Sequence, residues 1–237
     1  MLELSRDLTV DLAGSDARHG FGLFETCRIQ DGRVRWLDLH LARMAAGCRL
    51  LGLPHLPEQA QVAAFLASHL DLPMAGGLRL IAVDGRLGVQ VDAAPPPLAG
   101  PATLAVAMSL RRLAGAPGTR AKLLSYADNR LLHAEAAQRG LFEVIALNEA
   151  GRLTDGGRTT LLVVRDGEVL TPPTTDGALP GIARRVLLEA GCVKEASLTP
   201  EDLAQAEGLM LVNALRGGIA VKEDPQGKLA RCAEHLG

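Results

Sequence analysis

The sequence predicts a mixed α/β, or α+β, protein in two domains. Strand-like segments and amphipathic helices are interleaved along the 237 residues, without the strict βαβ alternation of a doubly wound sheet. Hydrophobic residues make up 48% of the chain, which is enough for one large core or two modest ones. The Gly/Ala/Pro-rich stretch 113–119 predicts a flexible joint. We therefore expect a smaller domain over 1–111, a loop over 112–120 and a larger domain over 121–237.

The N-terminal half opens with a predicted strand over 22–30, and Asp31-Gly32 before RVRW predicts a hairpin with a primed turn. The following segment places one apolar stripe on a helix, formed by Leu37, Leu41, Met44, Cys48 and Leu51. A second helix is predicted over 57–69. Three strands should follow, over 76–85, 87–93 and 103–110.

The C-terminal half begins with a predicted helix over 125–140 that ends at a glycine. Several β segments over 142–173 are separated by Asp-Gly and Glu-Ala-Gly turns. The segment GALPGIARRVLLEAG, 177–191, predicts a helix, and a short one should follow over 200–206. Residues 209–224 then read as a strand, a tight Gly-Gly turn and another strand.

Composition excludes several classes of function. Charged residues make up 22% of the chain and the net charge is only −2, so no basic footprint for nucleic acid or anionic membranes exists. No apolar run approaches the roughly 20 residues that span a bilayer. The opening MLELSRDLTVDL lacks the basic flank and apolar run of a signal peptide, so we expect a cytoplasmic protein. The four cysteines stand far apart and suggest reduced thiols, and no spacing suggests a metal site.

Three short segments could carry chemistry. Lys122 lies in the apolar stretch AKLLSY, where burial would lower the amine pKa and favour a nucleophile, although a lysine beside leucines is also typical of a surface. GALPGIARR offers backbone N–H groups at a helix N-terminus, suited to phosphate or to ordinary capping. NALRGG offers a second anion-binding turn, or only a turn.

Six segments in this order resemble the class IV aminotransferase family, the fold type IV pyridoxal-phosphate enzymes. They are GLFETCRI, LDLHLARM, AKLLSYADNRLLHAEAAQRG, LTDGGRTTLLVVRDGEVLTPP, ALPGIARRVL and VNALRGGIAV. The resemblance covers about residues 18–221. It implies a two-domain fold in which each domain packs helices on a sheet, an enzyme, and pyridoxal 5'-phosphate as cofactor.

The resemblance also implies roles for single residues. The family's Schiff-base lysine falls on Lys122, its phosphate-binding arginine, in the pattern H-x-x-R, on Arg43, and its tyrosine near the cofactor's phenolic oxygen on Tyr126. The backbone N–H groups that bind the phosphate fall on Ile182, Ala183 and Ala214. A guanidinium and a helix N-terminus both favour a phosphate dianion.

The chain departs from the family pattern at several positions. The motif E-G-S-x-S-N reads here as residues 155–160, DGGRTT, so the glutamate that pairs with the pyridine nitrogen becomes the shorter Asp155. Ala183 stands where many members have a threonine. The family's G-D-G reads Gly20-Phe21-Gly22, and the usual opening strand with its Asn-Gly turn is expected to be missing.

Within the family, FETCR and NALRGG look most like aminodeoxychorismate lyases, which release pyruvate to form 4-aminobenzoate in folate biosynthesis. Branched-chain or D-amino acid aminotransferases are the alternative, and a non-catalytic cofactor binder is a third. Thr26 would assist the leaving group, and Arg216 would either pair with a substrate carboxylate or be a solvated turn residue. His19 and Arg28 are expected to be structural. Family members close their site with a loop of a second subunit, which implies a homodimer.

Overall fold

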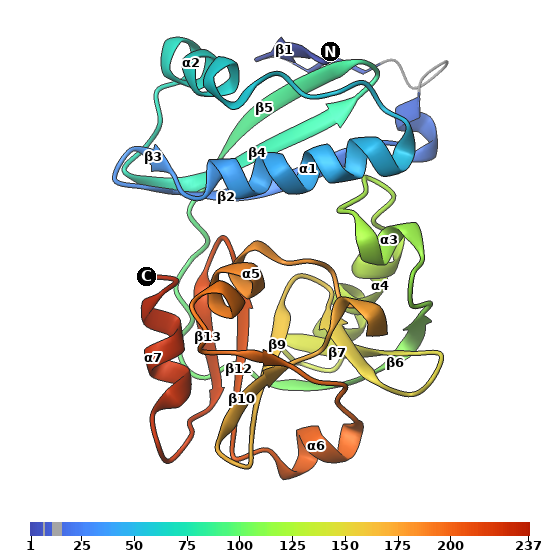
Figure 1. The fold of residues 1–237 in the computed structure, drawn as a ribbon, viewed down its shortest axis with the longest axis vertical. Helices are drawn as coiled ribbons and strands as arrows, with labels where there is room; N and C mark the ends of the chain where they lie inside the picture. Colours follow the sequence, from blue (N-terminus) through green and yellow to red (C-terminus); the bar gives the residue numbers. More distant parts are fainter. Residues whose placement is uncertain (7, 11–15) are drawn as a thin grey trace. The chain divides into compact units, whose positions relative to one another are not determined.

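The computed structural model describes residues 1–6, 8–10 and 16–237. The chain divides into two compact units (Figure 1): unit 1 is Met1–Pro96 with Ala121–Tyr126, and unit 2 is Pro97–Arg120 with Ala127–Gly237. Each unit combines strands with helices, so the predicted mixed α/β class is confirmed. No helix within the described ranges is long and apolar enough to cross a bilayer. Residues 7, 11 and 12 of the stretch assessed for a signal peptide lie outside those ranges.

The described part of unit 1 forms a five-stranded sheet in the order β1-β5-β4-β2-β3. Its strands are β1 (Glu3–Ser5), β2 (Leu23–Gln30), β3 (Arg33–Val34), β4 (Ala75–Val83) and β5 (Arg86–Ala93), and a 3-10 turn, η1 (Asp16–His19), precedes β2. The predicted primed turn is confirmed, because Asp31 and Gly32 have φ angles of 52° and 69°. β1 pairs in parallel with β5, so an opening strand is present, contrary to expectation, although the sequence has no Asn-Gly turn after it. Three residues are too few to show a strand-like alternation in sequence.

Two helices, α1 (Leu37–Leu51) and α2 (Gln59–His69), cover one face of this sheet. Figure 1 shows α1 running along the strands. Leu41, Met44 and Cys48 of the predicted stripe are buried, and Leu37 and Leu51 pack at its ends. The inward residues of β2, β4 and β5 complete the core, among them Leu23, Ile29, Leu78, Leu80 and Leu87. Gly52 ends α1 with a φ of 69°, as its position predicts.

The described part of unit 2 contains two sheets, ordered β11-β10-β9-β12-β13 and β6-β7-β8. The first consists of β9 (Thr160–Arg165), β10 (Glu168–Thr171), β11 (Lys194–Glu195), β12 (Gly208–Asn213) and β13 (Gly217–Lys222). The second consists of β6 (Leu104–Arg112), β7 (Glu143–Asn148) and β8 (Leu153–Gly156). Buried aliphatic side chains of both sheets share one core, including Ile145, Leu153, Leu161, Val163 and Leu211.

The helices of unit 2 are α3 (Pro117–Arg120), α4 (Ala127–Gln138), α5 (Ile182–Glu189), α6 (Pro200–Gln205) and α7 (Lys228–Glu234), with a 3-10 turn, η2 (Thr174–Asp176), before α5. The predicted helices over 125–140, 177–191 and 200–206 are thus confirmed with shorter bounds. α7 was not predicted from the sequence. Its signal is the spacing of Leu229, Cys232 and Leu236, all buried.

The units differ from the predicted domains in where they divide. β6 pairs in parallel with β7, with Leu104 opposite Glu143 and Arg112 opposite Asn148, so this strand belongs to unit 2. The division falls between Pro96 and Pro97, earlier than the predicted joint at 112–120. The residues of a strand do not reveal which strand it will pair with. The sequence offered a second candidate linker, the stretch 95–101 with four prolines in seven residues, and the division falls within it. Part of the predicted joint at 112–120 forms α3.

Candidate active site

The backbone around Lys122 pairs with the entrance to β2. The Phe24 N–H donates to the Lys122 carbonyl at 3.0 Å, and the Leu124 N–H donates to the Gly22 carbonyl at 2.9 Å. Residues 121–126 consequently belong to unit 1, although the sequence predicts Lys122 in the C-terminal domain. The short apolar stretch is therefore an additional extended segment beside β2, which fixes the lysine relative to that strand.

The Lys122 side chain lies between two aromatic rings. Its Nζ atom is 4.3 Å from the centre of the Phe24 ring and 5.0 Å from that of Tyr126, and it donates to the Tyr126 hydroxyl at 3.5 Å. The two rings meet edge to face at 5.0 Å. The structure thus brings together two of the residues singled out from the sequence, and adds Phe24, which the sequence analysis did not single out.

Arg43 lies on α1 and pairs with a buried carboxylate on β2. Its Nε and Nη2 atoms donate to the two oxygens of Glu25, at 2.8 and 2.5 Å. His40, one turn earlier on α1, places its Nδ1 atom 2.7 Å from Glu25 Oε2. Glu25 was missed at the sequence level. The signal was present, because a strand that alternates inward residues places Glu25 between Leu23 and Cys27 on the core face.

The electrostatics of this group favour a fixed ion pair. Burial raises the pKa of the Glu25 carboxyl, but the Arg43 charge and the hydrogen bonds from His40 and Arg43 outweigh burial and lower it to about 2. Burial lowers the pKa of the Arg43 guanidinium, and Glu25 more than offsets that effect, so the pKa is raised. An electrostatic interaction with Tyr126 also raises the pKa of the Arg43 guanidinium, by less than the effect of Glu25.

Thr26 lies on the face of β2 opposite to Glu25. This face also carries Phe24, because neighbours two apart in a strand point the same way. Across the sheet, Thr26 is the Cα partner of Arg79 on β4, whose guanidinium pairs with Asp92 at 3.4 Å. The predicted hydroxyl therefore shares a sheet face with the ring under Lys122 and with an arginine that the sequence analysis did not single out.

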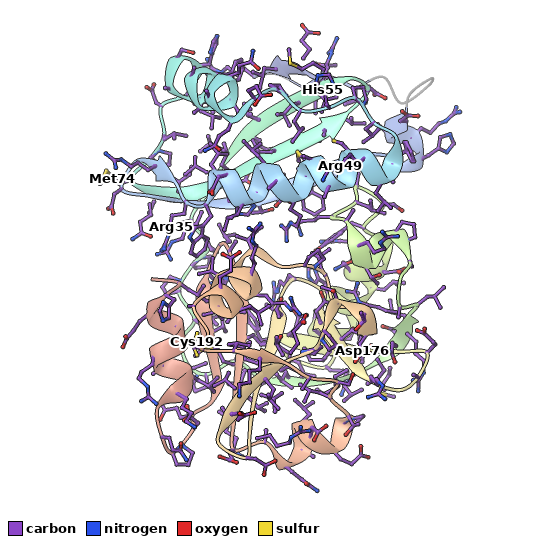
Figure 2. All side chains as sticks on the ribbon, in the orientation of Figure 1. Arg35, Arg49, His55, Met74, Asp176 and Cys192 are labelled. Carbon is purple, nitrogen blue, oxygen red and sulfur yellow. The ribbon has the colours of Figure 1, made fainter. Side chains whose placement is uncertain are left out.

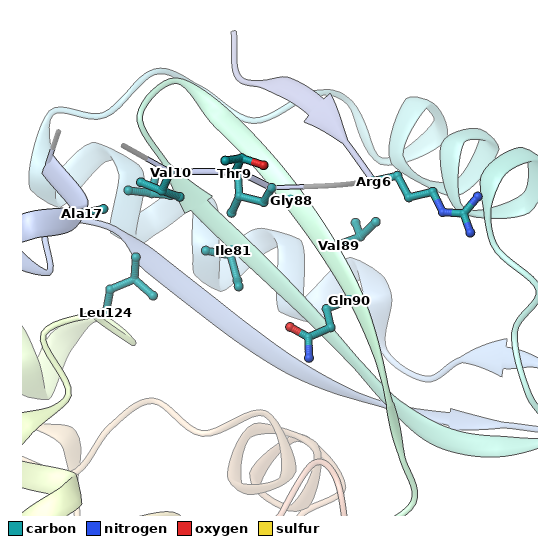
Figure 3. A pocket seen from close by; sticks show the side chains of 11 residues that line it. Arg6, Thr9, Val10, Ala17, Ile81, Gly88, Val89, Gln90 and Leu124 are labelled. Atoms are coloured by element: carbon teal, nitrogen blue, oxygen red, sulfur yellow. The ribbon is translucent and has the colours of Figure 1, made fainter. Parts of the chain in front are cut away.

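A cavity of about 470 Å³ opens on the same unit (Figure 3). Its walls include Ile81 of β4, Gly88 and Gln90 of β5, and Leu124, two residues beyond Lys122. Ile81 and Gly88 are directly paired across the two strands. The cavity therefore lies over paired residues of β4 and β5 and is lined mainly by apolar groups.

Asp155 lies at the end of β8 in unit 2 and is buried. Its Oδ2 atom accepts the Leu179 N–H at 3.0 Å, which ties it to the loop before α5. Its Oδ1 atom lies 3.3 Å from Arg112 Nε, yet neither atom has a hydrogen-bond partner within the described ranges. Arg112 instead donates through Nη2 to the Gly156 carbonyl at 3.1 Å. A buried carboxylate oxygen that lacks a hydrogen-bond donor fits a protonated ring nitrogen.

The departure from serine at Gly157 has a steric cause. A Cβ atom at this position would meet His133 Cδ2 at 2.6 Å and the Asn129 carbonyl at 3.0 Å. The Asn129 side chain also donates to the Gly157 carbonyl at 2.7 Å, so α4 packs directly on this turn. The turn is further held by the buried Glu143, which accepts the N–H groups of Gly157 and Arg158. The local packing thus explains the glycine.

The N-terminus of α5 has the geometry of an anion site. Gly181 precedes the helix and has no side chain that could cap it. The N–H groups of Ile182 and Ala183, in the first turn, therefore point out of the helix end without a side-chain acceptor. A Cβ atom on Gly181 would lie 3.0 Å from Thr160 Oγ1, so β9 approaches this end closely. The side chains of Ile182 and Ala183 are buried and apolar, so the polar groups of these residues are their backbone N–H and carbonyl groups.

The turn after β12 differs from the predicted Gly-Gly turn. Asn213 Oδ1 accepts the N–H groups of Leu215 and Arg216, at 3.1 and 2.8 Å, and Gly217 already begins β13. The Asn213 side chain shapes this turn, and Gly217, with a φ of 72°, ends it. Burial lowers the pKa of the Arg216 guanidinium, and the charge of Arg158 lowers it further. The guanidinium groups of Arg216 and Arg158 therefore lie near each other. The N–H of Ala214, the predicted phosphate ligand in this turn, makes no hydrogen bond within the part of the chain described.

The four cysteines are free thiols, and Cys192, after α5, is the most exposed of them (Figure 2). No group of three or more metal-ligating side chains occurs among the described residues. Unit 1 offers the Lys122 amine, the Tyr126 hydroxyl and the Arg43 guanidinium. Unit 2 offers a carboxylate oxygen in need of a donor and an uncapped helix N-terminus. These chemistries fit pyridoxal phosphate, which has an aldehyde, a ring nitrogen and a phosphate.

Comparisons with known proteins agree with this chemistry. The family model described as amino-transferase class IV matches residues 22–223. A bifunctional aminodeoxychorismate lyase / D-amino acid transaminase of Mycobacterium tuberculosis is 31% identical over 234 residues, covering 84% of this chain and 80% of the relative.

Solved structures share the fold. One from Legionella pneumophila has a TM-score of 0.84 at 22% identity and covers 99% of both chains. A hypothetical aminotransferase from Mycobacterium tuberculosis, in its PLP-bound form, has a TM-score of 0.79 at 25% identity, over 98% of this chain and 93% of its own. The third sequence-based hypothesis, a non-catalytic binder, is therefore not supported. The chain belongs to the class IV aminotransferase family and is a pyridoxal-phosphate enzyme.

Proposed function

We propose that this enzyme is a 4-amino-4-deoxychorismate lyase that forms 4-aminobenzoate and pyruvate, a step of folate biosynthesis. The observation that carries the proposal is the Lys122 amine held over Phe24, on the sheet face that also carries the Thr26 hydroxyl. One amine and one hydroxyl can together serve a β-elimination. The relative named for both lyase and transaminase activity supports the same substrate class.

In this proposal each predicted residue has one task. Pyridoxal phosphate, when bound, supplies an electron-poor ring that stabilises negative charge on a neighbouring carbon. Arg43 and the N–H groups of Ile182, Ala183 and Ala214 would hold the phosphate. Asp155 would hold the protonated ring nitrogen, and Tyr126 would hold the phenolic oxygen.

The elimination needs a base and an acid. Lys122 Nζ removes the proton from the substrate carbon that bears the amino group. The bond between the neighbouring carbon and the enolpyruvate oxygen breaks, and Thr26 assists that oxygen as it leaves. Enolpyruvate gains a proton and becomes pyruvate, while the six-membered ring becomes aromatic. Arg216 pairs with a substrate carboxylate.

The test mixes pure enzyme with pyridoxal phosphate and aminodeoxychorismate in the absence of any amino acceptor. We expect 4-aminobenzoate, followed by its fluorescence, and pyruvate, followed with lactate dehydrogenase, in equal amounts. Lys122→Ala is the control and should form neither product. If the wild type forms no 4-aminobenzoate without a 2-oxo acid, the lyase assignment is wrong.

A transaminase is the second candidate, because the relative from Mycobacterium tuberculosis carries both names. A transaminase uses the same Lys122 but must bind an amino acid and a 2-oxo acid in turn. D-alanine or a branched-chain amino acid with 2-oxoglutarate should then yield glutamate. Glutamate formation without any lyase turnover would favour this alternative.

The proposal also includes a cytoplasmic homodimer. The reduced state of Cys27, Cys48, Cys192 and Cys232 supports a reducing compartment. The family resemblance supports the dimer, and sedimentation equilibrium of the pure enzyme tests it. A molar mass of about one chain of 24.9 kDa over the working concentration range would exclude a stable dimer.

A further inference from the structure

Glu25 is a buried carboxylate to which the proposed reaction gives no task. It lies on the core face of β2 among Leu23, Cys27 and Ile29, and it is 1% exposed. A carboxylate in such surroundings is retained only with strong partners, because an unpaired buried charge is strongly destabilising. Its partners therefore indicate what it does.

Both partners come from one face of α1. His40 and Arg43 are three residues apart, so they project from adjacent positions of the helix toward β2. Glu25 Oε2 receives both His40 Nδ1 and Arg43 Nη2, and Oε1 receives Arg43 Nε. Since the ionised carboxylate can only accept, the contact assigns the proton of His40 to Nδ1. His40 thus anchors the carboxylate that holds the arginine.

The arginine is held side-on. Engagement of Nε and Nη2 by one carboxylate fixes both the plane and the rotation of the guanidinium group. The opposite edge, which carries Nη1, then faces away from Glu25.

We propose that Glu25, anchored by His40, is a positioning residue that presents the Arg43 guanidinium to the cofactor phosphate. The proposal rests on the assignment of Arg43 to the phosphate in the proposed function. Without the side-on pair, the long Arg43 side chain would have to be ordered when the phosphate binds, and that ordering would weaken binding. A carboxylate that only stabilises the core would affect folding, not recognition of the phosphate.

The test compares pyridoxal 5'-phosphate with pyridoxal, which has the same ring and aldehyde but no phosphate. Both are titrated into the cofactor-free wild type and Glu25→Gln, and binding is followed by the absorbance of the bound ring. We expect Glu25→Gln to bind pyridoxal phosphate about tenfold to one hundredfold more weakly, the range typical when a residue that orients a ligand-binding group is lost. Pyridoxal affinity should change less than about twofold, within the scatter of a lost surface contact.

A matched control is available in unit 2. Glu135 is also buried, pairs with Arg139 and accepts the N–H groups of Met108 and Ser109. Glu135→Gln should lower thermal stability while leaving the ratio of the two affinities unchanged. Glu25→Asp keeps the carboxylate but is one methylene shorter, so the charge lies further from Arg43. This variant should lose part of the preference for pyridoxal phosphate over pyridoxal. It serves as the test if Glu25→Gln does not fold.

The Arg43 and Glu25 variants test two different statements: that Arg43 binds the phosphate, and that Glu25 positions Arg43. Arg43→Gln should lose phosphate selectivity, and if it does not, Arg43 does not bind the phosphate and the proposed assignment fails. If Arg43→Gln loses selectivity but folded Glu25→Gln and Glu25→Asp retain it, Arg43 stays in its role and the positioning role of Glu25 is wrong. Tighter binding of pyridoxal phosphate by Glu25→Gln would equally overturn it, since it would show that Glu25 competes with the phosphate.

Discussion

Arg112 Nε lies 3.3 Å from Asp155 Oδ1, and the two side chains are 5% and 7% exposed. Arg112 ends β6 and Asp155 lies in β8, so the pair spans the two outer strands of the three-stranded sheet. The ion pair keeps a carboxylate buried at the position where the family has a glutamate. The ion pair and the Leu179 N–H together hold the Asp155 side chain in place.

Removal of the arginine should therefore destabilise the fold. Arg112→Met leaves Asp155 buried without its cation, and we expect the free energy of unfolding to fall by about 3 kcal/mol. Urea denaturation of the cofactor-free enzyme measures the change. Arg165→Met is the control, because Arg165 is 41% exposed in its pair with Asp202 and should lose less than about 1 kcal/mol. Equal losses in the two variants would contradict the prediction.

Tyr126→Phe isolates the hydroxyl from the ring. The edge-to-face contact with Phe24 is retained, whereas the hydrogen bond with Lys122 Nζ is lost. We expect pyridoxal phosphate affinity to fall by about tenfold, the value of one hydrogen bond to a charged or strongly polar partner. The absorbance band of the bound cofactor should shift as well. An unchanged band and affinity would show that the hydroxyl does not reach the cofactor.

Stability should fall in acid because of Glu25. Its pKa is lowered in the folded state from 4.5 to about 2, so the stabilisation is fully present above pH 4.5 and is lost as the pH falls through about 2. The buried pair should contribute about 3 kcal/mol over this range. Urea unfolding at several pH values between these limits tests it, with Glu25→Gln as the reference. The variant should show a flatter profile, and parallel profiles would refute the assignment.

Gly157→Ser restores the serine of the family motif and should be harmful here. The added Cβ atom would meet the His133 ring at 2.6 Å and the Asn129 carbonyl at 3.0 Å. We expect a loss of about 1–2 kcal/mol, as for other overpacked positions, measured as a lower midpoint of thermal unfolding. A smaller residue at 133 relieves one of the two clashes. The double variant Gly157→Ser, His133→Ala should lose less than the sum of the single changes.

Local patterns predicted the elements whose signal lies in their own residues. The alternation in β2, the apolar stripe of α1 and the Asp31-Gly32 turn all follow from neighbouring residues, and the structure confirms them. The pairing of β6 with β7 joins segments that are far apart in sequence, so the boundary between the units was misplaced. The turn at Asn213 was placed too late, because the Asn213 side chain begins it and Gly217, with a φ of 72°, already ends it.

The site residues divide in the same way. Lys122, Tyr126 and Arg43 were found through the family segments, and the structure places Lys122 beside Tyr126 and pairs Arg43 with Glu25. Their functions stay predictions. Glu25 and Arg112 could not be assigned from the sequence, because each acts through a partner on another element: Glu25 through α1, and Arg112 through β8. A charged residue inside an apolar strand is the one signal that could have pointed to them.

The alternation of β2 has a consequence for how this enzyme can change over evolution. Phe24 and Glu25 are adjacent, yet one supports the Lys122 amine and the other holds Arg43 on the opposite face of the sheet. A single-residue deletion before them would exchange the two faces along the rest of the strand. Substitutions can therefore alter the two contacts separately, whereas insertions and deletions in β2 would remove both at once.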